Sequence, residues 1–107
     1  MNDEQLKDLA EWSAEFLKLE VNKFHPTVWI LTDTPFSVEP DHFFNHPLNA
    51  PILMHLGKRE MEKREMNMDY CFRKGAHSVS FMCGPVTHDT NEYTAFWSAV
   101  MQAIKEE

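Results

Sequence analysis

The chain has few glycines and few cysteines, and both shortages exclude functions. Its 107 residues include three glycines, which form no GxGxxG or P-loop pattern for phosphate binding and no GxSxG pattern of serine hydrolases. The two cysteines, Cys71 and Cys83, form no CxxC pair, so zinc-ribbon spacing is absent. The common phosphate-cradling loops and cysteine-based zinc sites are therefore not expected.

Basic residues are also scarce. Ten lysines and arginines face seventeen aspartates and glutamates, which gives a formal net charge of −7. Such a field repels nucleic acid unless the positive charge is strongly clustered. We expect no nucleic-acid partner, and the acidic surface favours a basic protein partner. The basic cluster that exists alternates with glutamates, as on a solvated helix face: Lys58, Arg59, Lys63 and Arg64, with Glu60, Glu62 and Glu65.

Long hydrophobic runs are missing as well. No apolar segment approaches the roughly 20 residues that span a bilayer. The first residues, MNDEQLKDLAEW, are acidic and contain no apolar core of a signal peptide. The sequence therefore predicts no membrane partner and a cytoplasmic location, in which thiols stay reduced.

The chain does contain enough apolar material for a core. Hydrophobic residues make up 43% of the sequence, and the length suits one domain over residues 1–107. Asn2 and Gln5 resemble a capping box at the start of a helix over residues 2–20. The apolar residues of this segment recur at helical spacing: Leu6, Leu9, Ala10, Ser13, Phe16 and Leu17.

Prolines divide the middle of the chain. Short apolar or alternating runs between them predict strands at residues 28–32 and 36–39, followed by a loop over residues 41–48. A second helix is expected to begin near Asn49, because Asn is a good N-cap and Pro51 suits the first turn. Its predicted buried positions are Ile52, Leu53 and Leu56.

Residues 68–83 alternate between apolar and polar and predict a β-hairpin. Gly75-Ala76 can form its two-residue turn, with glycine at the position that needs a positive φ. In that register Cys71 lies opposite Ser80, on the face away from Cys83, so no disulfide is expected. The predicted core face consists of Tyr70, Phe72, Val79, Phe81 and Cys83.

A final helix follows a loop over residues 85–90. Asp89 and Glu92 form a second candidate capping box. The element order is then α-β-β-α-β-β-α, which predicts an α+β domain with a mostly antiparallel four-stranded sheet packed by helices, as in an α/β/α sandwich. The apolar stripe of the last helix is Tyr93, Phe96, Trp97, Val100, Ala103 and Ile104.

The loop over residues 41–48 carries the one candidate metal site. His42 and His46 are four residues apart, but the flanking prolines make a helix there improbable, so only the loop itself can bring them together. Asp41 or His55 would supply a third ligand, and two histidines with a carboxylate suit zinc or iron. The competing interpretation is that a phenylalanine anchors the loop on the core while the histidines stay solvated.

Trp12 is the candidate partner-binding residue. It lies at the edge of the apolar face of the first helix, and tryptophan is favoured at the centre of protein interfaces. Packing at the edge of the core is the alternative. A homodimer formed through Trp12 or through a sheet edge is a further possibility.

Short motifs along the chain resemble those of one family. Residues 9–12 read LAEW in the acidic first helix, residues 38–43 fit VEP-D-x-F, and residues 48–50 read LNA before the middle helix. On these motifs the chain resembles the phage ABA sandwich domain, a family of small phage and prophage proteins. The resemblance implies an α/β sandwich and a phage-related origin, and it carries over no activity or catalytic residue. The chain departs from the family pattern at His46-Pro47, where an aspartate is usual, and in its aromatic last helix.

The sequence thus predicts a non-enzymatic protein without a cofactor, which acts by protein–protein interaction. The first alternative is a metal-dependent enzyme or metal-binding protein that uses the His42/His46 loop. The second alternative is a structural homodimer.

Overall fold

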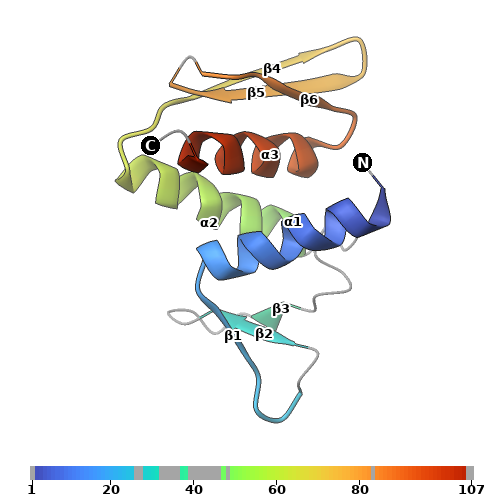
Figure 1. Cartoon of the computed structure of the whole chain (residues 1–107), viewed down its shortest axis with the longest axis vertical. Coiled ribbons are helices and arrows are strands. Elements are labelled where there is room, and N and C mark those ends of the chain that lie inside the picture. The colour runs from blue at the N-terminus through green and yellow to red at the C-terminus, as the bar shows by residue number, and fades with distance from the viewer. Residues whose placement is uncertain are drawn as a thin grey trace. The chain divides into compact units, whose positions relative to one another are not determined.

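A computed structural model of the chain describes residues 2–25, 28–31, 37–38, 47, 49–82 and 84–105. Within these residues it is an α+β structure with three helices and two three-stranded antiparallel sheets (Figure 1). The chain divides into two compact units, residues 1–52 and 53–107.

The first unit begins with α1 (Asp3–Phe16), and its predicted capping box is confirmed. The Asn2 side chain accepts a hydrogen bond from the Gln5 N–H at 2.8 Å, and the Gln5 side chain accepts one from the Asn2 N–H at 3.0 Å. The helix ends four residues earlier than predicted, because Lys18 adopts a left-handed φ of 57°. The buried residues of α1 are Leu9, Ala10, Ser13 and Ala14.

The sheet of the first unit has the strand order β1-β2-β3. The strands are β1 (Leu19–Val21), β2 (Trp29–Leu31) and β3 (Ser37–Val38). β2 and β3 fall within the two strands that the sequence predicts. β1 was not predicted, because its first two residues were assigned to the end of the first helix. Residues 17–22, LKLEVN, do alternate between apolar and polar, as a strand would.

The second unit begins within α2 (Asn49–Lys63). The helix starts at Asn49 as predicted, with Leu53 and Met61 almost fully buried. It ends in a Schellman motif, in which the Met66 N–H donates to the Met61 carbonyl at 3.0 Å and Glu65 has a φ of 59°. The role of Asn49 as the N-cap remains a prediction.

The sheet of the second unit has the order β4-β5-β6, with β4 (Met68–Arg73), β5 (Ala76–Phe81) and β6 (Thr87–Asp89). The predicted hairpin is confirmed, but its turn is Lys74-Gly75 rather than Gly75-Ala76. Both turn residues have a positive φ, 53° and 76°, as a type I′ turn requires.

The corrected turn moves the hairpin register by two residues. Cys71 lies opposite Ser78, not Ser80, and Phe72 lies opposite His77. A shift of two residues leaves every side chain on its face of the sheet. The predicted separation of the two hairpin faces therefore survives, with Tyr70, Phe72, Val79 and Phe81 on one face and Cys71 on the other. The position of Cys83 lies outside the described residues.

The last helix, α3 (Glu92–Lys105), packs against β5 and β6 (Figure 1). Its cap is Asn91, whose side chain accepts hydrogen bonds from the Tyr93 and Thr94 N–H groups at 2.9 and 3.2 Å. The predicted Asp89 capping box is wrong, because Asp89 belongs to β6 and accepts from the Asn91 N–H at 2.8 Å. The core between helix and sheet includes Phe81, Phe96, Trp97, Val79 and Val100.

The predicted four-stranded sheet is therefore wrong for the described part of the chain. The four expected strands are present as β2, β3, β4 and β5, but they belong to two sheets. Each sheet gains a three-residue strand that was not expected: β1 lies at the predicted end of the first helix, and β6 lies in the predicted loop over residues 85–90.

Candidate functional site

The predicted metal site falls mostly outside the described residues. Asp41, His42 and His46 lie outside the described residues, and His55 is exposed on α2. Among the residues that the structure describes, no three His, Cys, Asp or Glu side chains gather into a group that could hold a metal ion. The metal site therefore stays a prediction about the 41–46 segment.

Trp12 is half-buried on α1 and stacks on Phe16. The ring centroids are 5.4 Å apart and the planes differ by 13°. Such a parallel stack fits packing at the edge of the helix's apolar face. The role of Trp12 as a partner anchor stays a prediction.

A row of polar side chains crosses one face of the second sheet. Cys71 on β4 lies opposite Ser78 on β5, which lies opposite His88 on β6. The Ser78 hydroxyl and His88 Nδ1 are 2.7 Å apart, within hydrogen-bonding distance. His77, the base that the sequence places nearest to Cys71, lies on the opposite face of the sheet, so the two cannot act together.

The Ser78–His88 contact resembles a nucleophile and its base, but its surroundings do not suit acyl transfer. β5 pairs with both neighbouring strands over residues 77–79. Its backbone N–H groups there are taken up by the ladder and cannot form an oxyanion hole beside the serine. We therefore interpret the contact as a cross-strand hydrogen bond.

The opposite face carries an aromatic cluster, which we call the aromatic strip: the exposed Tyr70 and Phe72 on β4 and the half-buried His77 on β5. The Phe72 and His77 ring centroids are 4.6 Å apart, and those of Tyr70 and His77 are 5.8 Å apart. The Tyr70 hydroxyl lies 2.6 Å from His77 Nδ1. The strip is thus held in place by ring contacts and a hydrogen bond, although its side chains are in contact with solvent.

The exposure of the aromatic strip follows from the position of α3. The helix packs on β5 and β6, where Val79 and Phe81 are 0% and 4% exposed. Tyr70 and Phe72 share that face but belong to β4, and they are 46% and 57% exposed. The prediction that they are core residues is wrong, because the helix covers two strands and not the third.

The phenol of Tyr70 keeps its proton at neutral pH. Partial desolvation raises the pKa of Tyr70 above its ordinary 10.0, and the negative charges of Glu92 and of Cys71, when ionised, raise it further. A protonated phenol can donate a hydrogen bond to His77 Nδ1. The hydroxyl of Tyr70 therefore stays available to hold the ring of His77.

The backbone edge of β4 completes the site. β5 pairs with one side of β4 over all six residues, Met68–Arg73, and no described strand pairs with the other side. The side chains of residues 69–73 are exposed on both faces. The pairing is continuous, without a bulge, and the strand contains no proline, so two common devices that block a sheet edge are absent from β4.

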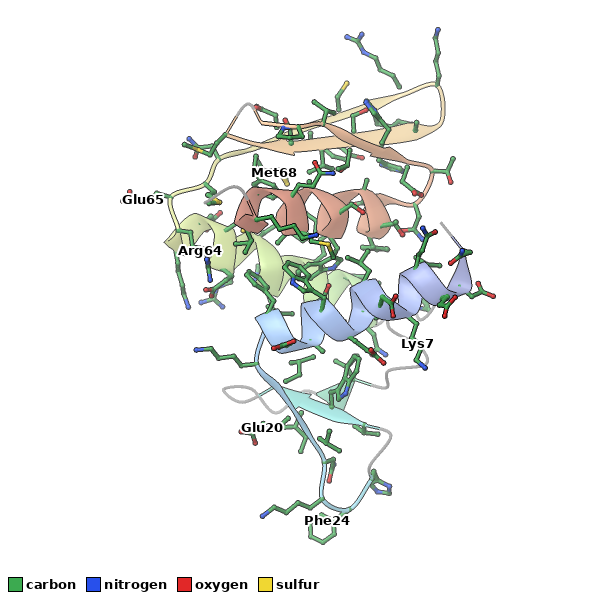
Figure 2. All side chains as sticks on the ribbon, in the orientation of Figure 1. Lys7, Glu20, Phe24, Arg64, Glu65 and Met68 are labelled. Carbon is green, nitrogen blue, oxygen red and sulfur yellow. The ribbon has the colours of Figure 1, made fainter. Side chains whose placement is uncertain are left out.

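Another exposed aromatic residue, Phe24, lies in the first unit. Phe24 is 88% exposed in the loop after β1, and Figure 2 shows it at the tip of that loop. The Phe24 N–H donates to the Asn22 side chain at 2.9 Å, which fixes the turn. Phe24 is thus an exposed ring in a loop, in contrast to the rings of the aromatic strip, which lie on a sheet.

Sequence reasoning placed the two aromatic residues of β4 on the correct face but assigned them to the core. No local sequence signal separates them from buried residues, because Met68, Tyr70 and Phe72 alternate as regularly as the residues of β5 do.

Within the described residues no helix is both long and apolar enough to cross a membrane. Comparison with known proteins gives no match to any family model, curated protein or solved structure.

Proposed function

We propose that the chain is a non-catalytic protein-binding module, which accepts an extended segment of polypeptide as an additional strand along β4. The observation that carries the proposal is the exposed aromatic strip directly beside the open β4 edge. An added strand would pair its backbone with β4 and place alternate side chains beside Tyr70 and Phe72. In this mode the main-chain hydrogen bonds provide affinity and the alternate side chains provide specificity.

The composition of the strip supports a binding role. Exposed aromatic side chains with few rotatable bonds bury a large area at a small entropic cost, and they are enriched at the energetic centres of interfaces. Here His77 already restrains Phe72 and Tyr70 through ring contacts. The net charge of −7 would favour basic segments during encounter. A phage-related accessory role, as the family resemblance implies, belongs to the same proposal.

Selection from a displayed library of random linear peptides of about ten residues tests this function, since that length is enough for one strand. We expect selected peptides to slow amide hydrogen exchange along β4 when they bind the full chain. The Y70S/F72S variant should bind them at least about tenfold more weakly, as expected for the loss of interface anchors. The control is F24S, which removes a ring that is even more exposed but lies far from β4 in the sequence, and it should leave binding unchanged.

Two results would contradict the proposal. Either the library yields no peptide that binds the full chain at a dilution where the chain is monomeric, or the selected peptides bind the wild type and the Y70S/F72S variant equally well.

A further inference from the structure

The charges of β4 suit the same strand in a second copy of the chain. We propose that the segment added to β4 is β4 of a second copy, antiparallel, with a two-fold axis at Cys71. The inference rests on the proposed function, because it names the partner for the same open edge.

Symmetry limits the registers in which β4 can pair with itself. In a two-fold antiparallel pair the axis is perpendicular to the sheet, so each side chain stays on its own face. Opposing residues then lie at equal distances from one central residue. A centre at Tyr70 pairs residues 68–72, and a centre at Cys71 pairs residues 69–73.

Charge complementarity distinguishes these two registers. Centring on Cys71 places Asp69 of each copy opposite Arg73 of the other, which gives two pairs of opposite charge. Centring on Tyr70 places Asp69 opposite Cys71 and leaves Arg73 outside the pairing. Opposite charges directly across a strand pair are favourable and like charges are unfavourable, so the Cys71 register is preferred. All three side chains are exposed in the single chain and available for this contact.

The opposite face of the same register is also complementary. Tyr70 of each copy lies opposite Phe72 of the other, and aromatic cross-strand pairs are among the favourable ones. The side chains that α3 leaves exposed, 46% for Tyr70 and 57% for Phe72, would cover each other. The two copies together would form one six-stranded sheet. In this sheet the aromatic strips of the two copies meet between the two α3 helices.

Long-range repulsion between the copies opposes this pairing. Each chain has a net charge of −7, so two copies repel each other at low ionic strength. At about 0.15 M salt the screening length is about 8 Å, which weakens the distant charges more than the directly opposed Asp69 and Arg73. The measurements below therefore belong at that ionic strength.

A charge exchange tests the register with the full-length chain. Light scattering over a dilution series should show a dimer for the wild type. D69R and R73D alone should each weaken it about tenfold or more, because each variant places like charges opposite each other twice. An equimolar mixture of the two variants should recover the dimer, since every opposed pair is then of opposite charge. The D69R/R73D double variant should recover it as well.

The matched controls change the net charge equally but on the exposed side of α2. E62R and K63D shift the net charge in the same directions as D69R and R73D, and neither should change the dimer. Cys71 supplies a second readout, because the axis brings the two Cys71 thiols together. In the C83S background, a short thiol–thiol crosslinker should join the wild-type β4 strands but not those of D69R alone.

The outcomes separate this inference from the proposed function. A wild-type chain that stays monomeric up to about millimolar concentration would overturn the second copy as partner, and peptide binding to β4 would still support the function. The pairing at Cys71 would be overturned if D69R and R73D each dimerised as strongly as the wild type. It would also be overturned if the equimolar mixture of the two variants did not dimerise. A wild-type chain that neither dimerises nor binds any peptide would overturn both proposals.

Discussion

Gly57 on α2 and Trp97 on α3 lie so close that a side chain on Gly57 has no room. A Cβ atom there would stand 2.7 Å from Cη2 of Trp97 and 2.8 Å from Cε1 of Phe96. Both rings are buried, at 1% and 0% exposure, so neither can swing away freely. The glycine is therefore explained by helix packing and not by backbone conformation.

We expect G57A to destabilise the protein by about 1–3 kcal/mol, the usual cost of overpacking a core. Helix propensity alone predicts the opposite sign, because Ala exceeds Gly by about 1 kcal/mol within a helix. Urea unfolding followed by circular dichroism measures the difference. The control is R59A, at an exposed position of the same helix, which should stay within about 0.5 kcal/mol of the wild type. A G57A variant as stable as the wild type would contradict the close packing.

At the end of α2, by contrast, a substitution is expected to stabilise the protein. Glu65 holds a left-handed φ of 59° at the position where a Schellman motif favours glycine. We expect E65G to stabilise the protein by about 1 kcal/mol, because the left-handed conformation costs a residue with a Cβ about that much. Thermal unfolding should show an increase in Tm.

The control for E65G is E62G, three residues earlier on the exposed side of the helix. There the φ is helical, and glycine should cost about 1 kcal/mol. If both variants shifted Tm in the same direction, the Schellman motif would not be the cause.

Sequence patterns predicted the three helices, the β4–β5 hairpin, β2 and β3, and missed β1 and β6. The three helices and the β4–β5 hairpin each repeat their periodicity over several residues, so their existence could be read directly. β1 lies where the end of the first helix was expected, and β6 lies in the segment expected to be a loop. Because each of them completes a separate sheet, missing them produced one four-stranded sheet instead of two three-stranded ones.

Local sequence does not determine whether Tyr70 and Phe72 are buried or exposed. Periodicity assigns Tyr70 and Phe72 to a face, and that assignment is confirmed by their pairing with Val79 and His77. Whether a face is buried depends on where the covering helix lies, and α3 packs on β5 and β6. The candidate site was therefore predicted as part of the core.

The hairpin turn provides a third test. Lys74 has a φ of 53° at the first position of a type I′ turn, where asparagine is preferred and Asn-Gly is the commonest pair. We expect K74N to stabilise the protein by up to about 1 kcal/mol, because asparagine visits the left-handed region more readily than lysine. K74V, which puts a β-branched residue at positive φ, should destabilise it. Equal effects of both variants in urea unfolding would contradict the type I′ geometry.

The stability of the protein should fall at alkaline pH through Tyr70. Its pKa in the folded chain is raised above 10.0, first by desolvation and then by the charges of Glu92 and Cys71. Between the unfolded and folded pKa values the folded chain binds more protons than the unfolded chain, so the free energy of unfolding decreases as pH rises. The contribution is fully present below pH 10 and is lost as pH rises through the folded pKa.

Absorbance at the tyrosinate wavelength measures the titration itself. In a Y93F background Tyr70 is the one remaining tyrosine, and its ionisation should occur above pH 10 in the folded chain and near pH 10 in urea. Replacing Glu92 with glutamine should lower the folded pKa, since a negative charge near the phenol is removed. An E92Q variant whose Tyr70 titrates as in the wild type would show that Glu92 does not act on the phenol. A folded pKa at or below the value in urea would contradict the desolvation of the aromatic strip.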